Sequence, residues 1–216
     1  MVDNISLTGS EQVWEETLGW RPTAHPLEQF QALYTQILQG NQQLNLTRII
    51  EGQDFWEKHL WDSLAGISPW LVGATPMPLP ERCRVIDIGS GGGFPGLPVA
   101  IAHPQWHISL LDATRKKMAF LATVALELGL ANVGVICDRA ESLGQDPAHR
   151  QQYNLALIRA VGPASVCAEY ALPFLKVEGY AVLYRGQWSE EEAEGLSSAL
   201  EALGGAIVST RRCLLP

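Results

Sequence analysis

The first third of the chain carries its apolar residues at the spacing of helices. Between residues 26 and 40, an apolar residue recurs every three or four positions, which is the spacing of one buried helix face. A second stretch of this kind covers residues 53–67, where His59 and Asp62 share another face because they lie three positions apart. We expect a helical cap over residues 1–72.

A proline-rich stretch separates this cap from the rest of the chain. Pro76, Pro78 and Pro80 all fall within residues 73–83, and proline interrupts a helix because it lacks a backbone N–H. We therefore expect a connector here, followed by a single domain over residues 84–216.

From residue 84 onward, short apolar runs alternate with stretches of helical spacing. The apolar runs predict strands at residues 84–88, 106–111, 133–137, 154–159 and 179–184. The intervening stretches predict helices at residues 95–102, 114–128 and 163–174. This alternation is typical of an α/β, Rossmann-like fold with a mostly parallel sheet covered by helices on both faces. In such sheets, ligands bind beyond the carboxyl ends of the strands.

The first predicted strand leads into a loop with almost no side chains. The loop begins after Asp87 and contains Gly89, Gly91, Gly93 and Gly96. Backbone N–H groups in a loop of this kind approach a ligand closely. Counted from the second of these glycines, the loop matches the dinucleotide pattern G-x-G-x-x-G. Counted from the acidic residue, it matches the acid-x-G-x-G-x-G pattern of class I S-adenosylmethionine-dependent methyltransferases.

The residues around the loop favour the methyltransferase interpretation. Asp112 ends the next predicted strand and is placed to accept hydrogen bonds from ribose hydroxyls. The Asp87 carboxylate suits the cationic methionine end of S-adenosylmethionine and would repel a pyrophosphate. Phe94 and Pro95 also stand where a dinucleotide loop needs room for phosphates. An NAD-dependent oxidoreductase on a similar fold and a small-molecule methyltransferase stay open as alternatives.

The composition predicts the cellular compartment and argues against a membrane protein and a metal-binding protein. No apolar run reaches the roughly 18 residues of a membrane span and no signal peptide begins the chain, so we expect a cytoplasmic protein without a membrane partner. We also expect a monomer. Its four cysteines are far apart and lack the spacing of metal ligands, which indicates buried, reduced thiols and no metal site.

The charge of the chain is unevenly distributed. The net charge is -8, whereas RNA binding normally needs a basic surface. Several cations follow the predicted strands, namely Arg115, Lys116, Lys117, Arg139, Arg159 and Arg185. Acidic residues gather instead in a predicted C-terminal helix at Glu190, Glu191, Glu192, Glu194 and Glu201. The cations predict a local basic rim at the active-site edge; ordinary solvated surface charges are the alternative.

An ordered series of motifs makes the chain resemble one family. The series is Asn45-Leu46-Thr47, His59-Leu60-Trp61-Asp62-Ser63, Asp87 to Pro98, Leu111-Asp112 with Lys116-Lys117, Arg139-Ala140-Glu141 and Arg159-Ala160. These motifs resemble the RsmG family, also called GidB, of bacterial enzymes that make 7-methylguanosine in 16S ribosomal RNA. The resemblance implies S-adenosylmethionine as methyl donor, S-adenosylhomocysteine as product, and 16S rRNA or the small ribosomal subunit as partner.

The resemblance also supplies candidate site residues. The candidates for cofactor binding are Gly89, Gly91, Phe94, Asp112, Ala113, Thr114, Ala140, Glu141 and Arg159. The candidates for catalytic positioning are His59, Asp62 and Arg139. Three of these have structural alternatives: Glu141 as a helix-start carboxylate, Arg159 as a salt bridge between sheet and helix, and His59 in a local hydrogen bond.

The segment after the fourth predicted strand narrows the chemistry. It reads Arg159-Ala160-Val161-Gly162-Pro163 and has neither the Pro-Pro-aromatic loop of amine methyltransferases nor the Pro-Cys pair needed for attack on a pyrimidine ring. Guanine N7 carries an in-plane lone pair and no proton, so methyl transfer to it needs positioning rather than a strong base. The segment therefore fits N7 chemistry.

Two features depart from the family pattern. Arg185 stands before Gly186-Gln187 where the family usually has lysine, and the two cations differ in geometry. We also find no pattern for the last strand that would complete a seven-stranded sheet, so we expect this strand to be missing.

Overall fold

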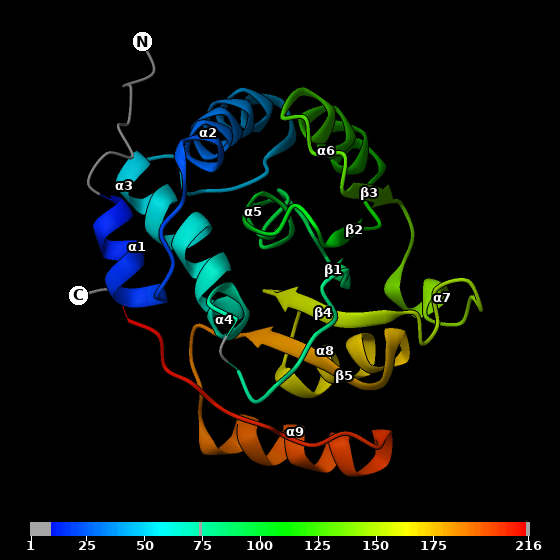
Figure 1. Cartoon of the computed structure of the whole chain (residues 1–216). Coiled ribbons are helices and arrows are strands. Elements are labelled where there is room, and N and C mark those ends of the chain that lie inside the picture. The colour runs from blue at the N-terminus through cyan, green and yellow to red at the C-terminus, as the bar shows by residue number, and fades with distance from the viewer. Residues whose placement is uncertain (1–9, 74, 215–216) are drawn as a thin grey trace.

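Five parallel strands form one twisted sheet (Figure 1) in the computed structural model, which describes residues 10–73 and 75–214. The order across the sheet is β3-β2-β1-β4-β5. The strands are β1 Arg84–Ile88, β2 His107–Leu111, β3 Val133–Ile136, β4 Tyr153–Arg159 and β5 Leu175–Tyr184. The parallel sheet expected from the sequence is confirmed, although β5 begins four residues before the predicted start at residue 179.

The end of β1 lies at the point where the chain stops adding strands on one side of the sheet and begins to add them on the other. β1 pairs with β2 on one side and with β4 on the other, so Ile88 lies opposite both Leu111 and Ile158. The chain proceeds from β1 to β2 and β3, and then returns to add β4 and β5 on the opposite side. A crevice at such a reversal is the usual binding position in an open parallel sheet.

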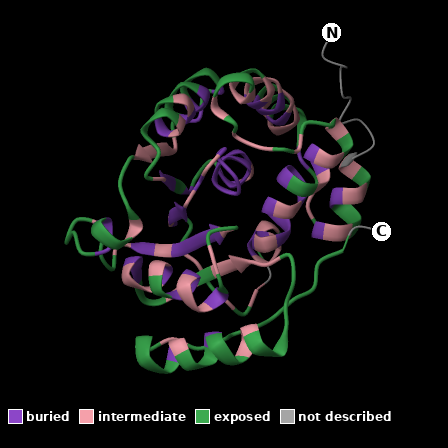
Figure 2. Ribbon diagram, turned by 180° about the vertical axis from the view of Figure 1, so that it is seen from behind, coloured by how far each residue is buried: buried purple, intermediate pink, exposed green. Residues whose placement is uncertain are grey.

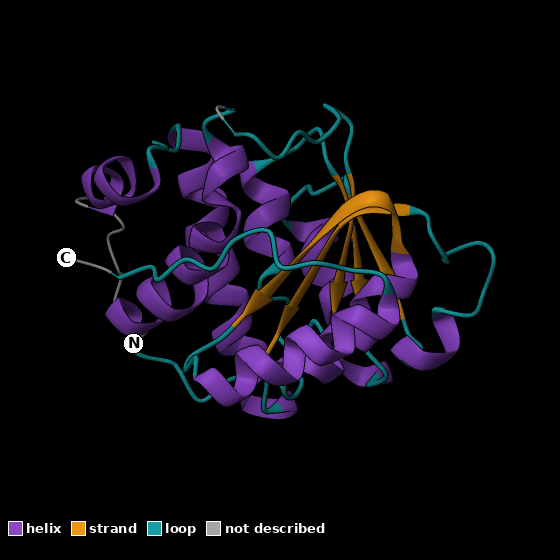
Figure 3. Cartoon of the chain, turned by 90° about the horizontal axis from the view of Figure 1, so that it is seen from below, coloured by secondary structure: helices purple, strands orange, loops and turns teal. Residues whose placement is uncertain are grey.

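Helices cover both faces of the sheet (Figure 3) because successive side chains of each strand point to opposite faces. On one face, α5 Gly96–Ala102 and α6 Arg115–Glu127 share a core with Val85. On the other face, α7 Ala140–Leu143, α8 Ala164–Ala171 and the 3-10 turn η2 Leu172–Phe174 pack with Ile86 and Ile158.

The N-terminal helices pack directly onto the first of these cores. They are α1 Ser10–Leu18, α2 Ala24–Leu44, α3 Gly52–Phe55, the π-helix η1 Trp56–Trp61 and α4 Asp62–Leu71. Trp14, Phe30 and Leu64 belong to the same buried cluster as Val85 and Leu97. The helix expected over residues 53–67 is therefore interrupted by a π-helix, a feature that is frequent at functional sites.

The C-terminal part lies outside these two cores. Helix α9 Glu190–Leu203 packs on α8 through a small cluster that includes Leu196 and Leu200. Most of α9 is exposed (Figure 2). Residues 205–214 form neither helix nor strand and run back past α9 to α4, where the Arg211 guanidinium donates a 2.9 Å hydrogen bond to Ser68 Oγ.

Two further expectations concern membranes and thiols. None of the described helices combines the length and the apolar character that a membrane span requires. All four cysteines are free; Cys83 and Cys167 are buried, whereas Cys137 and Cys213 are exposed. The expectation of buried thiols is therefore wrong for two of the four, because Cys137 follows β3 at the sheet edge and Cys213 lies in the C-terminal segment.

Candidate cofactor-binding and active site

The glycine-rich loop is tied to the end of the neighbouring strand. The backbone N–H groups of Gly89 and Ser90 donate to the Leu111 carbonyl oxygen at 2.8 and 3.0 Å. In return, the Leu111 N–H donates to Ser90 Oγ at 3.1 Å. These bonds hold the loop after β1 against the point where β2 ends, so the loop and Asp112 are adjacent, as the sequence predicts.

Glycine is required in this loop both for its backbone angles and for the space around it. Gly89, Gly91 and Gly93 have φ values of 72°, 54° and 92°, in the left-handed region that other residues rarely adopt. A Cβ at Gly93 would lie 2.5 Å from Leu97 Cδ1, and one at Gly96 would lie 2.7 Å from Asp87 Oδ2. At Gly93 and Gly96 the loop therefore packs so closely against α5 and β1 that a side chain does not fit.

Asp112 accepts a backbone N–H at each carboxylate oxygen, one from the glycine-rich loop and one from the segment after β2. Its Oδ2 accepts a 3.1 Å hydrogen bond from the Gly91 N–H, and its Oδ1 accepts a 2.8 Å bond from the Thr114 N–H. A carboxylate oxygen has two lone pairs, so each retains one acceptor site. The side chain is partly exposed, and Ala113 and Thr114 beside it are exposed. Asp112 can thus accept from a pair of ligand hydroxyls while it holds the loop.

Asp87 is a fully buried carboxylate with spare acceptor capacity. Its Oδ2 accepts a 2.9 Å hydrogen bond from the Gly96 N–H, whereas Oδ1 has no hydrogen-bond partner among the described residues. Burial raises the pKa of Asp87 to about 7, although the Gly96 N–H and the charge of Arg159 act in the opposite direction. A buried acceptor without a partner is costly, so a cationic or N–H group of a ligand would be well matched to it.

His59 is a neutral, buried ring in contact with the same loop. It stacks on Phe94 with ring centroids 4.3 Å apart and planes 9° apart. Its Nε2 lies 2.7 Å from Thr47 Oγ1. Burial, together with the charge of Arg159, lowers the pKa of His59 to about 3. The imidazole is therefore uncharged near neutral pH and cannot serve as a cationic acid there.

Arg159 connects the sheet to the N-terminal helices. Its Nη1 donates to Asp62 Oδ2 at 2.8 Å and to the Lys58 carbonyl oxygen at 2.9 Å. The guanidinium carbon also lies 5.8 Å from the centroid of the Phe94 ring. The Arg159 side chain is 17% exposed and that of Asp62 is 44% exposed. The salt bridge between sheet and helix is therefore present, and a contact of Arg159 with cofactor or RNA stays a prediction.

The Arg139-Ala140-Glu141 segment forms a separate group at the end of β3. Arg139 Nη2 lies 2.8 Å from Glu141 Oε1, to which the Tyr170 hydroxyl also donates at 3.3 Å. Glu141 stands in the first turn of α7, the position of the helix-start alternative, and Ala140 packs on the adjacent core. The Arg139–Glu141 ion pair thus lies beyond the end of β3, the strand at one edge of the sheet.

The positioning candidates consequently fall into two places. His59 and Asp62 both contact Arg159, which ends β4. Arg139 precedes α7 and follows β3, which lies on the opposite side of β1 from β4, and it pairs with Glu141. The structure brings together the first two candidates and leaves Arg139 with its own partner.

Comparison with known proteins identifies the family. Residues 26–215 match the model of the GidB family, described as rRNA small subunit methyltransferase G. The chain belongs to this family. The ribosomal RNA small subunit methyltransferase G of Nostoc punctiforme is 53% identical over 205 residues, which cover 95% of this chain and 83% of the relative. That of Synechococcus elongatus is 55% identical over 203 residues, covering 94% and 81%.

Membership of the GidB family confirms the resemblance seen in the motifs, and the protein is a methyltransferase with the class I Rossmann-like fold. The dehydrogenase alternative loses its basis, because the dinucleotide pattern was its support. Among solved structures, precorrin-6y C5,15-methyltransferase from Geobacter metallireducens has a TM-score of 0.47 and 16% identity, covering 73% of each chain.

Several residues of the site are absent from the sequence candidates. From the sequence, Asp87 has a role only through its charge, and Thr47 only as part of the Asn45-Leu46-Thr47 motif. Phe55 packs edge-on against both His59 and Phe94, with centroid distances of 5.0 and 5.5 Å. The motif is a signal from which Thr47 could have been chosen as a site residue. Phe55 has the spacing of any buried helix residue, so the sequence contains no signal for its role.

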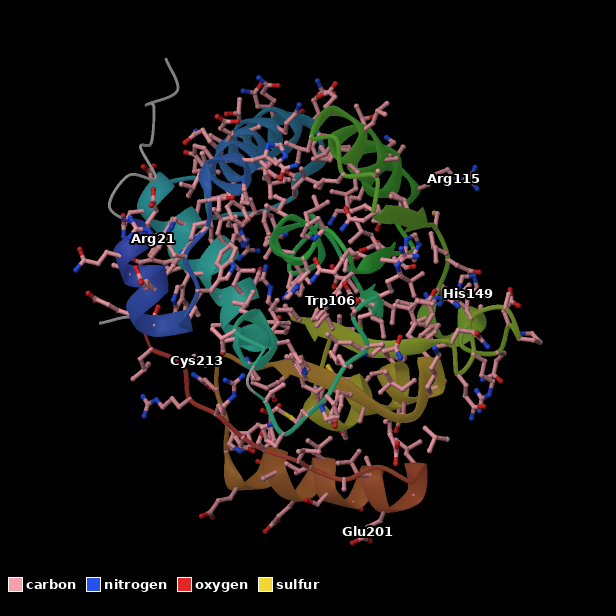
Figure 4. The ribbon with its side chains drawn as sticks, in the orientation of Figure 1. Arg21, Trp106, Arg115, His149, Glu201 and Cys213 are labelled. Atoms are coloured by element: carbon pink, nitrogen blue, oxygen red, sulfur yellow. The ribbon has the colours of Figure 1, made fainter. Side chains whose placement is uncertain are left out.

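The basic rim is smaller than the sequence suggests. Arg185 pairs with Glu192 of α9, and Arg139 and Arg159 pair with Glu141 and Asp62. Arg115 and Lys116 are exposed and form no ion pair within the described residues. Figure 4 shows Arg115 pointing away from the ribbon at the start of α6.

Two hollows lie near the helical part of the molecule. One, of about 420 Å³, is lined by residues of α1 and α4 and by residues 211–214. The other is an open depression of about 310 Å³ lined by Glu57, Lys58, Trp61 and Asp62. The depression shares Asp62 with the Arg159 ion pair, so it lies beside the candidate site.

In the described part of the chain, no three His, Cys, Asp or Glu residues are grouped to hold a metal ion.

Proposed function

We propose that this protein transfers the methyl group of S-adenosylmethionine to N7 of a guanine in the 16S rRNA of the small ribosomal subunit. The observation that carries the proposal is the Gly91–Asp112 contact in a chain that belongs to a family of rRNA small subunit methyltransferases. We further propose that it acts as a monomer in the cytoplasm and releases S-adenosylhomocysteine as product.

The residues around the loop fit the proposed cofactor. Asp112 retains one acceptor site on each carboxylate oxygen for the ribose hydroxyls. Asp87 presents a buried oxygen without a partner among the described residues, which matches the cationic methionine end. The close packing around Gly93 and Gly96 keeps side chains out of the loop. The residues proposed to hold the cofactor are Gly89, Gly91, Phe94, Asp112, Ala113, Thr114, Ala140, Glu141 and Arg159.

The protein's own contribution to the reaction is positioning and electrostatics. When bound, S-adenosylmethionine supplies a methyl group on a positively charged sulfur. Guanine N7 has no proton to lose, so the neutral His59 is not needed as a base. Its proposed role is to hold Phe94 in place by stacking. Asp62, partly exposed beside the site, is proposed to stabilise the positive charge that develops on the guanine. Arg139 is proposed to contact the RNA.

The acceptor and donor are tested together by a transfer assay. Labelled S-adenosylmethionine is incubated with small ribosomal subunits and with 16S rRNA that lack 7-methylguanosine, and the RNA is then digested to nucleosides. We expect label in 7-methylguanosine. Label in a different nucleoside, or none in either substrate while the cofactor binds, would overturn the assignment of guanine N7.

The role of Asp112 is tested with a matched pair of aspartates. Asp146 Oδ1 accepts a 2.8 Å hydrogen bond from the Ala148 N–H, two residues on, in the same way that Asp112 accepts from Thr114. We expect Asp112→Asn to weaken S-adenosylhomocysteine binding by about tenfold, since a hydrogen bond to a charged group contributes roughly 1.5–3 kcal/mol. Asp146→Asn should leave the affinity unchanged in the same calorimetric titration. Equal effects of the two variants would remove Asp112 from the binding site.

A further inference from the structure

The turn that follows α2 touches the glycine-rich loop from outside the sheet. A Cβ at Gly92 would lie 3.4 Å from the Leu46 carbonyl oxygen and 3.5 Å from Leu46 Cβ. Inside the turn, the Thr47 N–H donates to Asn41 Oδ1 at 2.9 Å, and the Ile49 N–H donates to Thr47 Oγ1 at 3.0 Å. These bonds fix the position of the Thr47 hydroxyl beside the loop.

The contacts of His59 determine which ring nitrogen carries the proton. Arg159 Nη2 lies 3.3 Å from His59 Nδ1. A guanidinium has only donors, so Nδ1 must accept. The proton of the neutral ring is then on Nε2, which donates to Thr47 Oγ1 at 2.7 Å. Thr47 is therefore the acceptor that this tautomer of His59 requires.

The orientation of His59 reaches two groups of the proposed cofactor site. The ring is parallel to Phe94 within 9°, and Phe55 packs edge-on against both rings. On the Nδ1 side, the His59 ring contacts Arg159. Arg159 also donates to Asp62 and to the Lys58 carbonyl oxygen. A ring turned out of this plane would lose the stack on Phe94, and a ring flipped within the plane would place a C–H group in front of the guanidinium in place of the Nδ1 acceptor.

We propose that Thr47 is a positioning residue for cofactor binding: its hydroxyl accepts from the Nε2–H group of His59 and so fixes the orientation of this ring, through which it holds Phe94 and Arg159. The proposal rests on the function proposed above. It assigns a role to the Asn45-Leu46-Thr47 motif, which touches the loop by way of Leu46 and His59 by way of Thr47.

The first test compares two substitutions at the same position. Thr47→Val keeps the shape of the side chain and removes the hydroxyl, whereas Thr47→Ser keeps the hydroxyl. We expect Thr47→Val to weaken S-adenosylhomocysteine binding by about five- to tenfold, the effect of about one hydrogen bond. The KM for S-adenosylmethionine should rise in parallel while kcat changes by less than about twofold. Thr47→Ser should restore both values.

A matched control lies on α2. The Thr35 hydroxyl donates to the Gln31 carbonyl oxygen at 3.1 Å and does not contact the loop. Thr35→Val should leave cofactor affinity unchanged. Denaturant unfolding of each variant, measured in parallel, checks that every variant is folded under the conditions of the binding titration. An equal loss of affinity in Thr35→Val and Thr47→Val would overturn the proposal.

The decisive readout is the state of the ring itself. The nitrogen-15 chemical shifts of His59 should show the Nε2–H tautomer, which the Arg159 contact requires, in the wild type and in both variants. The Nε2–H proton should exchange with water faster in Thr47→Val than in the wild type and in Thr47→Ser, because it has lost its acceptor. This measurement needs neither cofactor nor RNA, so it stands even if methyl transfer to guanine fails. An unchanged exchange rate of the Nε2–H proton in Thr47→Val would overturn the proposal.

A double-mutant cycle separates action through His59 from general damage. His59→Phe keeps an aromatic ring over Phe94 and removes both nitrogens. In that background, Thr47→Val should cause little further loss of affinity, because the two residues act as one unit. Losses that add in full would show that Thr47 acts independently of His59 and would refute the proposed connection.

Discussion

The two halves of the carboxyl edge of the sheet use their charged residues differently. On the β1–β2 half, Asp112 binds only backbone N–H groups of the loop and of Thr114, and the nearby cations Arg115 and Lys116 are exposed without an ion pair in the described residues. Asp112, Arg115 and Lys116 are thus available to other molecules.

The β4–β5 half pairs its charges internally. Arg159 is held by Asp62 and the Lys58 carbonyl oxygen. Arg185 pairs with Glu192 of α9, and Glu201 points outward from the same helix (Figure 4). The difference indicates that ligand recognition belongs mainly to the first half, whereas the charges of the second half fix the helices against the sheet.

The largest expected effect compares one glycine from each region. Gly93→Ala places a Cβ 2.5 Å from Leu97 Cδ1 at a φ of 92°, so we expect a loss of about 1–3 kcal/mol in the free energy of unfolding and at least about tenfold weaker S-adenosylhomocysteine binding. Gly195→Ala on α9 meets no atom within 4 Å and should increase stability by up to about 1 kcal/mol. Denaturant unfolding and calorimetry measure both effects; a harmless Gly93→Ala would contradict the close packing of the loop.

A second prediction concerns the buried acid between the two halves. Burial raises the pKa of Asp87 from 3.8 to about 7, although the Gly96 N–H and the charge of Arg159 lower it. Because the folded pKa lies above the unfolded one, the folded state binds more protons between these values. The contribution of Asp87 to stability is therefore full below about pH 4 and is lost as the pH rises to about 7.

Asp87→Asn removes this dependence on pH. Relative to the wild type, we expect the variant to gain roughly 2–3 kcal/mol in unfolding free energy between pH 5 and pH 8. Urea unfolding at the two pH values measures the difference, with pH 5 as the internal reference. The same wild-type-to-variant difference at both pH values would mean that Asp87 is already ionised at pH 5.

The smallest expected effect concerns the exposed cations. Replacing Arg115 and Lys116 by alanine should raise the KM for the RNA substrate a few-fold and lower the slope of log affinity against log salt by about one for each phosphate that the variant no longer neutralises. Cofactor affinity should not change. Arg82 and Lys176, exposed near the starts of β1 and β5, are the matched controls at the opposite edge. An equal decrease in slope from both pairs would argue for diffuse attraction in place of a defined rim.

The sequence was most informative where the determining interactions are local. Apolar spacing predicted all five strands because a buried parallel strand is a short, nearly continuous apolar run. The loop was predictable because the left-handed φ values at Gly89, Gly91 and Gly93 favour glycine through the local backbone alone. The adjacency of Asp112 followed from the topology, since strands paired in parallel end at the same edge. The division of the chain at residues 73–83 stays a prediction.

What the sequence by itself determined is therefore the sheet, the loop and the position of the proposed ribose-binding acid. Only the tertiary structure decided how charged side chains are partnered: Arg159 meets Asp62 and His59 from 97 and 100 positions away, and Arg185 meets Glu192. Backbone conformation depends on neighbouring residues, which a pattern records, whereas the partner of a long side chain and the burial that shifts the pKa values of His59 and Asp87 depend on how distant elements pack.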